Sequence, residues 1–554
     1  MKSTLFKRLT AASLLALTLV GCGSEAKKEY VNYENADAKV SAEGGELISH
    51  SNMSYEEKTE VLGLLEAYAI KNNLTGLTLY EDGGYVMYNP RITKGTNDYI
   101  PGYGFGILSE GKITAPLEAE QNADWKEYYH TFETDNPGTI NYQNDKGSVV
   151  GGLIGYVSSG YWGNKMNANK DGYEWINSLA KEKPQAQNLK DGMATIYKFE
   201  VKVGSELVYN TLSENAIAKA YAGTEVKLED YLTPFKILHT KANAYARGAE
   251  NLSGAASIKG LDKFYAATGD GYNQEAWDEN VGIKATVEDG KSYLTFEFNN
   301  PCTPFYAMYY LASSLYAPVP QSFVDAIGGP AAWGSSTDAG LTPKDTFLST
   351  AEYCIEAWDA QQLVFKRNPL FAVEEGKFNI KGIHVNILPG QKSDTETAFR
   401  EFIAGKLDAV SIPQTKLEEF KNDPRTTTTV GSSTTKLNLN TCTQEEWDKL
   451  FGVNGTITQT RESEKWICEP IMSNDDFIRG LSYSLNRKEY AVNRGVTPSA
   501  NYFGSAYMSD PENGMAYNNT KAHADAVSYL MEGAEETFGY NLTLAKSYFK
   551  KAAD

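Results

Sequence analysis

The stretch at residues 402–409 reads FIAGKLDA and lies in a region where predicted strands and helices alternate. Residues 436–441 (KLNLNT) predict a strand, and a helix is predicted to begin near Ser473. Acidic residues in its first turn and an apolar stripe support that helix: Asp475, Asp476, Phe477, Ile478, Leu481 and Leu485. The alternation continues along the chain without a fixed-length repeat. It therefore predicts α/β or α+β layers and argues against a solenoid or a propeller.

Size and charge restrict the class of protein further. The chain has 554 residues, enough for two or three domains with their own cores. Hydrophobic residues make up 41% and charged residues 22%, which is the balance of a soluble globular protein rather than a disordered one. The 71 acidic and 52 basic residues give a net charge of -19. Such a surface repels phosphate backbones, so we expect no nucleic-acid partner.

The first residues predict a lipid anchor. A basic start precedes an apolar run at residues 9–20, which is too short to span a bilayer and is typical of a signal peptide. The run ends in LVGC at residues 19–22, which matches the bacterial lipobox, whose cysteine is diacylated. We therefore expect residues 1–22 to be a lipoprotein signal peptide and lipobox, lipidated at Cys22. Residues 23–50 would be a flexible tether that holds the body at the outer face of the bacterial cytoplasmic membrane.

Cysteines and histidines give no firm pattern of cross-links or metal ligands. The cysteines that remain after the lipobox are Cys302, Cys354, Cys442 and Cys468. They allow three pairings, and the sequence does not decide whether any disulfide forms. The histidines are scattered without an HExxH motif: His50, His130, His239, His384 and His523. We expect them to be solvated or packed side chains and predict no metal site.

Signatures of catalysis are missing from the sequence. It contains no GxxxxGK[ST] loop for phosphates and no GxSxG nucleophile elbow. Among 71 acidic residues, pairs that resemble a catalytic acid and base arise by chance. We therefore expect a protein that is not an enzyme and that needs no cofactor. A surface hydrolase of glycans or peptides, which would use such a carboxylate pair, is the alternative from a different class.

The folded region is predicted to open with a helix and a hairpin. Ser54 and Glu57 form a capping box before apolar residues at helical spacing, which predicts a helix over about 55–72. The Asp-Gly-Gly sequence at 82–84 separates two β-prone stretches and predicts a hairpin turn. We interpret residues 51–120 as an N-terminal extension.

Several segments, taken in chain order, resemble one family of receptors. They are 134–142 (TDNPGTINY), 194–201 (ATIYKFEV), 222–231 (AGTEVKLEDY), 315–320 (LYAPVP), 363–369 (LVFKRNP) and 402–409. The last is similar to the family's aGelDva motif nearly letter for letter. On these segments, and over about residues 128–554, the chain resembles the family 5 extracellular solute-binding proteins. These are the receptors of oligopeptide, dipeptide and nickel ABC importers.

The resemblance implies an α/β, two-lobed, periplasmic-binding-protein-like fold of type II, cluster C, with mixed sheets and an extra subdomain. The first lobe, with an inserted subdomain, would comprise residues 121–440, and the second lobe residues 441–554. The helix expected at 544–553 (LAKSYFKKAA) resembles one that lies well before the end of family members. The resemblance therefore implies that the second lobe is incomplete and that the chain is truncated at its C-terminus.

The resemblance also implies a ligand site between the lobes. The ligand-binding positions it implies are Asn136, Pro137 and Gly138 at the first-strand exit, Leu437, Asn438 and Leu439 on the linking strand, and Tyr245 in the pocket lining. A helix carrying Tyr156 and Tyr161 would follow the first-strand exit. A peptide ligand would favour the closed state, which would dock on an ABC permease driven by its ATPase subunits.

Other ligands and roles stay open at the level of the sequence. Within the same family, an oligosaccharide or another small solute is the alternative ligand. The 8 Trp and 36 Tyr residues keep a sugar in consideration, since aromatic rings stack on sugar faces. The scarce histidines weigh against nickel. A surface receptor or adhesin that retained the fold without transport is a further alternative.

Overall fold

The computed structural model describes most of the chain beyond residue 54. The described residues are 55–72, 76–94, 107–144, 148–169, 172–190, 192–238, 257–267, 274–388, 395–429, 431, 433–451, 467–492, 494, 496–511, 513–531 and 535–554. The predicted lipidation site Cys22, the tether at 23–50 and Tyr245 lie outside them. Of the helices in these ranges, none is long and apolar enough to cross a membrane.

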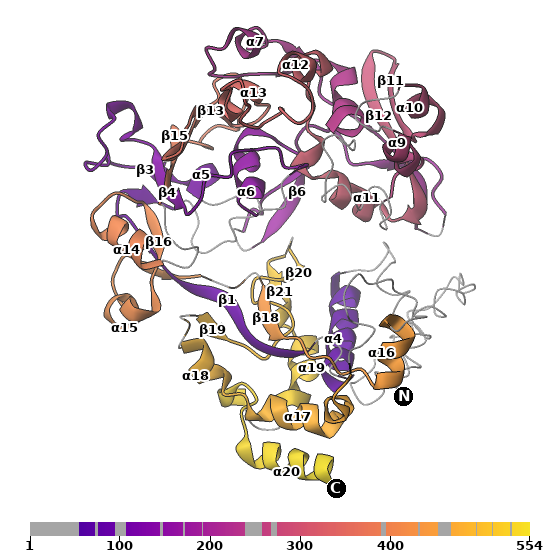
Figure 1. Ribbon diagram of the computed structural model, residues 1–554, viewed down its shortest axis with the longest axis vertical. Helices are drawn as coiled ribbons and strands as arrows, with labels where there is room; N and C mark the ends of the chain where they lie inside the picture. Colours follow the sequence, from indigo (N-terminus) through magenta and orange to yellow (C-terminus); the bar gives the residue numbers. More distant parts are fainter. Residues whose placement is uncertain are drawn as a thin grey trace.

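The chain forms two parts that lie one above the other in Figure 1. We call the described residues between 107 and 388 the upper part, and residues 55–72 together with the described residues between 433 and 554 the lower part. Both parts combine helices with short sheets, so the predicted mixed α/β architecture is confirmed. The segments that connect the parts lie along one side of the molecule (Figure 1).

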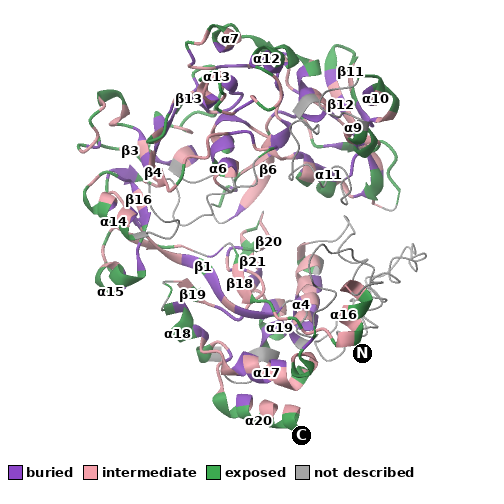
Figure 2. Ribbon diagram, viewed as in Figure 1, coloured by how far each residue is buried: buried purple, intermediate pink, exposed green. Residues whose placement is uncertain are grey.

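Two four-stranded sheets form the framework of the upper part. One is antiparallel, in the order β11 (Ile283–Glu288), β12 (Lys291–Cys302), β8 (Ala194–Glu200) and β7 (Gln185–Ala186). The other has the order β13 (Tyr353–Trp358), β14 (Gln362–Arg367), β15 (Gly382–Ile387) and β4 (Tyr129–Glu133), and only its β15–β4 pair is parallel. One buried cluster, rich in aromatic side chains, contains residues from both sheets. Figure 2 shows the buried residues concentrated on these inner elements.

Helices and small hairpins surround this framework. The helices of the upper part are α5 (Ile107–Glu110), α6 (Ser148–Val157), α7 (Ala216–Lys219), α9 (Leu261–Ala267), α10 (Gln274–Asn280), α11 (Pro304–Leu311), α12 (Gln321–Ala326) and α13 (Pro343–Thr346). Its hairpins pair β5 (Trp162–Met166) with β6 (Tyr173–Asn177), and β9 (Gly204–Val208) with β10 (Glu225–Val226). The helices of the lower part are α4 (Tyr55–Asn72), α16 (Gln444–Phe451), α17 (Asp475–Ser484), α18 (Arg487–Val492), α19 (Lys521–Met531) and α20 (Leu542–Ala553).

Helix α4 is an integral element of the lower part. Its bounds confirm the helix predicted from the capping box and the apolar spacing. A Cβ atom at Gly63 would lie 2.8 Å from the Cβ of Ala522, so α4 and α19 cross at a distance that only glycine permits. The buried Glu66 carboxylate accepts a hydrogen bond from the Tyr517 hydroxyl at 2.8 Å and lies 2.9 Å from Nδ1 of His523. The N-terminal segment and the C-terminal helices therefore share one core.

The hairpin predicted at 82–84 is wrong. Strand β1 (Leu77–Tyr88) runs through the Asp-Gly-Gly sequence as one element, with a register shift between Glu81 and Gly84. The reason is tertiary: the Asp82 N–H donates to the Ser433 carbonyl, and the Gly84 N–H donates to Oγ1 of Thr429. The polar groups that a local turn would use are thus bonded to a distant segment.

Strand β1 connects the two parts. Its first half pairs with β18 (Thr434–Leu437) and β19 (Val496–Pro498) of the lower part. Its second half pairs with β16 (Ala409–Ser411) and β17 (Thr426–Thr428), and β16 lies beside β4 of the upper part (Figure 1). Because β17 and β18 each pair with β1, the connection consists of paired strands.

The FIAGKLDA stretch contains a helix end, a turn and the start of a strand. Helix α14 (Thr395–Ile403) is terminated by Gly405, two residues beyond its end. The φ of 75° at Gly405 is a conformation that favours glycine. The Gly405 N–H donates to the Phe402 carbonyl and the Lys406 N–H to the Glu401 carbonyl, which is the Schellman pattern. The turn places Asp408 immediately before β16.

Asp408 forms a bidentate ion pair with Arg91. Its carboxylate accepts bonds of 2.7 Å from Nε and from Nη2 of Arg91, and both side chains are almost fully buried. The same carboxylate accepts the backbone N–H of His130 at 2.7 Å. Arg91 also donates to the carbonyls of Ala115, Lys126 and Tyr128. One ion pair therefore joins the end of β1, the loop before β4 and the FIAGKLDA turn.

Breaking this ion pair is expected to destabilise the fold strongly. In Asp408→Asn, Arg91 would remain as a buried cation without its carboxylate, a loss that costs about 3–5 kcal/mol in the free energy of unfolding. Chemical denaturation measures this cost. The control is Lys421→Ala, which removes an exposed pair with Glu418 and should cost about 0–1 kcal/mol. Equal losses in the two variants would contradict the role assigned to Asp408.

Candidate ligand-binding site

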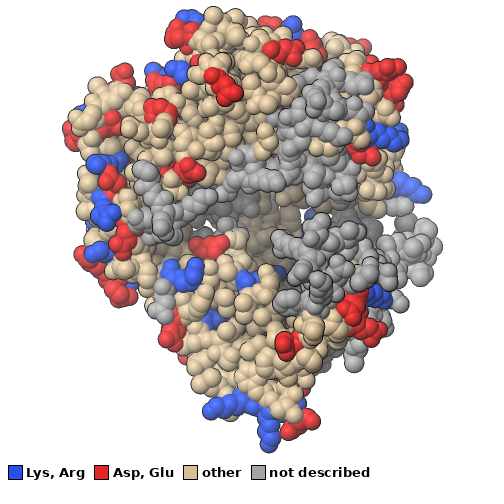
Figure 3. Space-filling view, viewed as in Figure 1, with Lys and Arg blue, Asp and Glu red and all other residues tan. Residues whose placement is uncertain are grey.

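A cavity opens at the end of strand β4, against one face of helix α6. It has a volume of about 180 Å³, and its lining residues are Glu133, Val149, Gly152, Leu153 and Tyr156. The helical members recur at intervals of three and four residues, so they form a single stripe on α6. In Figure 1, α6 lies on the side of the upper part that faces the lower part, and Figure 3 shows a hollow between the two parts.

The sequence of α6 (SVVGGLIGYV) explains both its packing and its open face. Val150, Ile154 and Val157 are completely buried, so they hold the helix on the sheet. Gly152 and Gly155 are exposed, and a Cβ atom added at either would meet no atom within 4 Å. Both glycines lower the intrinsic stability of the helix, and Gly152, which lines the cavity, leaves its backbone accessible to a ligand.

Glu133 supplies the charge of the cavity. Burial raises the pKa of its carboxyl above the ordinary value of 4.5. Within the described part of the chain, its carboxylate has no hydrogen-bond donor or cation as a partner. Burial, followed by the nearby charge of Glu133, also raises the pKa of Tyr156 to about 12. The cavity therefore combines an unpaired carboxylate, a protonated phenol and the exposed helix backbone at Gly152, which suits a ligand with one cationic group.

The predicted residues Asn136, Pro137 and Gly138 lie in a tight turn just after β4. The Asn136 side chain donates to the Asp359 carbonyl at 2.6 Å and accepts the N–H of Gly138 at 2.8 Å. It also accepts the indole N–H of Trp358 at 3.2 Å. Gly138 has a φ of 68°, which explains a glycine here. The turn joins β4 to the β13–β14 hairpin, and a ligand contact there stays a prediction.

The predicted hinge residues lie on the lower part. Leu437 ends β18, pairs with Leu77 and is exposed, and Asn438 is exposed as well. Leu439 is half-buried. Among the described residues, no hydrogen bond or strand pairing connects residues 437–439 with residues 136–138. The two groups therefore stand on different parts of the molecule, and their shared role in binding stays a prediction, as does that of Tyr245.

None of the residues that the sequence predicted to bind a ligand lines this cavity. The sequence placed Tyr156 and Tyr161 on one helix. Helix α6 carries Tyr156 but ends at Val157, so Tyr161 lies beyond it. Sequence reasoning missed Glu133, which directly precedes the segment that resembles the family. The available signal was the glycine pattern at 151, 152 and 155, which is unusual inside a helix.

The comparisons with known proteins place the chain in a family. The model of the bacterial extracellular solute-binding proteins, family 5 Middle, matches residues 223–553, more than half of the chain. The chain belongs to this family. The resemblance described from the sequence segments is thereby confirmed.

Individual relatives are distant. The oligopeptide-binding protein AmiA of Streptococcus pneumoniae serotype 4 (strain ATCC BAA-334 / TIGR4) is 24% identical over 402 residues. The match covers 70% of this chain and 52% of AmiA, so the chain spans about half the length of that relative.

Solved structures are similar at lower identity. OppA of Listeria monocytogenes bound to peptide has 15% identity and a TM-score of 0.44, covering 76% of this chain and 73% of that one. The substrate-binding domain of an oligopeptide ABC transporter from Bacillus anthracis str. Ames has 14% identity and a TM-score of 0.43, covering 79% of this chain and 67% of that one.

Glu133→Gln is expected to leave the unfolding midpoint at pH 7 unchanged or to raise it. Because the pKa of Glu133 is raised, the folded state binds the proton more tightly than the unfolded state does. Ionisation of Glu133 therefore lowers wild-type stability as the pH rises through 4.5 and the raised pKa. The difference between the variant and the wild type should shrink as the pH falls. Thermal unfolding from pH 3 to pH 8 measures it.

Asp423→Asn is the control, because the stability contributed by this carboxylate changes with pH in the opposite direction. Hydrogen bonds from Arg425 lower the pKa of Asp423 to about 2. Its carboxylate therefore stabilises the wild type above pH 3.8, and that contribution is lost as the pH falls toward about 2. If Glu133→Gln behaved like Asp423→Asn, Glu133 would have a cationic partner, and the interpretation of the cavity would be wrong.

Proposed function

We propose that this chain is a substrate-binding protein of an ABC importer that captures oligopeptides between its two parts. The observation that carries the proposal is the Glu133 carboxylate, which faces a cavity on the open side of α6 and has no partner among the described residues. A peptide offers the matching group, an ammonium at its amino terminus or on a lysine. The family assignment and the name of the AmiA relative support the same class of ligand.

The mechanism proposed for binding follows from the layout of the site. The ammonium of a peptide pairs with Glu133, and its first side chain enters the cavity beside Tyr156. The extended backbone passes the turn at 136–138 and reaches residues 437–439 on the lower part, with Tyr245 as a further contact. Contacts to both parts favour a closed state, and the paired strands around β1 are the connection about which the parts approach.

The proposed role in transport uses no chemistry on the ligand. The closed form docks on a membrane permease whose ATPase subunits supply the energy, and the chain itself acts as a binding protein, not as an enzyme. A lipid on Cys22 and the tether at 23–50 keep it at the outer face of the cytoplasmic membrane.

Filling the cavity is expected to abolish peptide binding. Gly152→Leu adds a side chain where a Cβ meets no atom within 4 Å, so the fold should tolerate it while the cavity loses its volume. Isothermal titration calorimetry with peptides identified by native mass spectrometry should show an affinity loss of about tenfold or more, at least about 1.4 kcal/mol. The control is Gly155→Leu on the same helix, outside the lining, which should bind like the wild type.

A second experiment varies the amino terminus of the peptide ligand. The wild type should prefer a peptide with a free amino terminus to its N-acetylated form, and Glu133→Gln should lose that preference. Unchanged binding in Gly152→Leu would place the site elsewhere. A co-purified oligosaccharide instead of peptides would support the alternative ligand class of the same family.

A further inference from the structure

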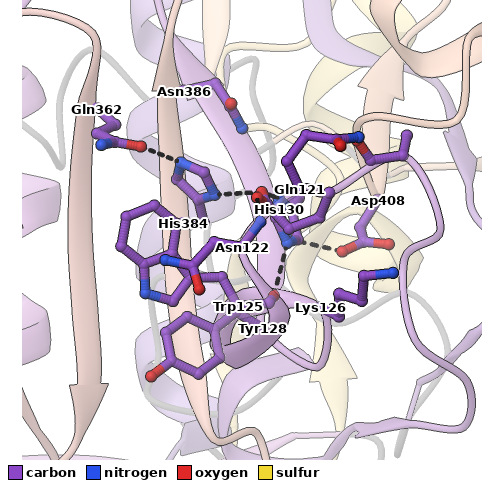
Figure 4. Close-up of polar contacts among 12 residues, drawn as sticks. Gln121, Asn122, Trp125, Lys126, Tyr128, His130, Gln362, His384, Asn386 and Asp408 are labelled. Atoms are coloured by element: carbon purple, nitrogen blue, oxygen red, sulfur yellow. Dashed lines mark hydrogen bonds and ion pairs between the residues drawn. The ribbon is translucent and has the colours of Figure 1, made fainter.

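Glu120, His130 and His384 form a cluster beside the Arg91–Asp408 ion pair. One ligand atom from each residue lies within 4.8 Å of the others. Both histidines are buried, and the Glu120 side chain is only 12% exposed. Figure 4 shows the two imidazoles side by side on neighbouring strands, with Trp125, Gln362 and Asp408 around them. The scattered positions in the sequence gave no sign of this cluster.

The backbone fixes the positions of all three side chains. His130 on β4 and His384 on β15 are direct neighbours in the parallel register, and their ring centroids are 4.8 Å apart. Glu120 enters from the loop before β4, which Arg91 holds through the carbonyls of Ala115 and Lys126. The Asn122 N–H donates to Oε1 of Glu120 at 2.7 Å, which turns Oε2 toward the imidazoles.

Hydrogen bonds on the far side of each ring determine the tautomers. Nε2 of His130 lies 2.9 Å from the carbonyl oxygen of Trp125, which can only accept, so Nε2 carries the proton. Nε2 of His384 lies 3.0 Å from Oε1 of Gln362. The Gln362 amide nitrogen donates to Asp359 at 3.0 Å, which fixes its oxygen toward His384. Both Nδ1 atoms therefore present lone pairs.

These lone pairs face a carboxylate oxygen. Oε2 of Glu120 lies 3.1 Å from Nδ1 of His384 and 3.8 Å from Nδ1 of His130, and Nδ1 of His384 has no hydrogen-bond partner in the described chain. Three electron-rich atoms at this separation repel one another unless a cation lies between them.

We propose that Glu120, His130 and His384 bind one divalent transition-metal ion, with zinc as the best match. Two imidazole nitrogens and one carboxylate oxygen are a donor set that suits zinc and not calcium or magnesium. In a tetrahedral zinc site with bonds of about 2.0–2.1 Å, neighbouring ligand atoms are about 3.3 Å apart. The two spacings from the carboxylate oxygen to the imidazole nitrogens, 3.1 and 3.8 Å, are close to that value, and all three ligand atoms lie within 4.8 Å of one another. Imidazoles that donate their other N–H to fixed acceptors are the usual second shell of such sites.

The ion would fasten the loop of Glu120 to the edge strand β4. That strand ends at Glu133, three residues beyond His130, so the ion would hold the strand that presents the carboxylate to the ligand cavity. The site is separate from the cavity lining, and its existence does not depend on the ligand proposed above.

The test uses the full chain without an affinity tag, stripped with EDTA and titrated with Zn²⁺ alone. We expect one ion per chain by calorimetry and native mass spectrometry, and a higher unfolding midpoint with the ion. Co²⁺ in its place should give the visible absorption of a tetrahedral N/O site. His384→Gln and Glu120→Gln should each weaken Zn²⁺ binding by about 100-fold.

The matched control is Glu127→Gln, in the same loop, where the carboxylate is exposed and pairs with Lys381 on the surface. It should bind Zn²⁺ like the wild type. Failure of the wild type to bind a stoichiometric ion would overturn the proposal. So would equal affinities in the wild type, Glu120→Gln and His384→Gln, since the ion would then occupy another site.

Discussion

The Arg91–Asp408 ion pair is the interaction on which the connection between the parts depends. Arg91 follows β1 and Asp408 precedes β16, so the pair closes the end of the strand system that joins the two parts. The remaining donors of Arg91 bind carbonyls of the loop before β4, and the Asp408 carboxylate accepts the backbone N–H of His130 at the start of β4. Buried charges are costly unless every group is paired, and here the guanidinium and the carboxylate satisfy one another and four backbone groups.

The Arg91–Asp408 ion pair positions both the cluster of Glu120, His130 and His384 and the cavity on α6. At one end of β4, His130 and Glu120 stand within reach of His384, and at the other end Glu133 reaches the cavity on α6. A strand of five residues thus connects a cluster suited to a cation with a carboxylate suited to an ammonium. Movement of the parts about β1 would leave these groups in place, because they all belong to the upper part.

Much of the fold was predictable because its signals are local. The capping box and the apolar spacing predicted α4, and the acidic first turn and apolar stripe predicted α17. Gly405 terminates α14 in a left-handed conformation. The hairpin at 82–84 failed for the opposite reason: the Asp-Gly-Gly signal is a local turn preference, and pairing with residues 429–433 outweighs it. The cavity was not foreseen, since it forms only where Glu133 at the end of β4 packs beside helix α6.

The sequence by itself determined the family, the mixed α/β architecture and the expectation of a lipid-anchored binding protein, because motif order, helix caps and the lipobox are encoded in contiguous residues. Only the tertiary structure decided that β1 is a single connecting strand, that Glu133 lines a cavity without a partner among the described residues, and that His130 lies beside His384. The pairing of β1 and the contact of His130 with His384 join residues separated by hundreds of positions, and the cavity forms between a strand end and a helix. A parallel register, a buried ion pair and a raised pKa arise from packing, and no short segment carries them.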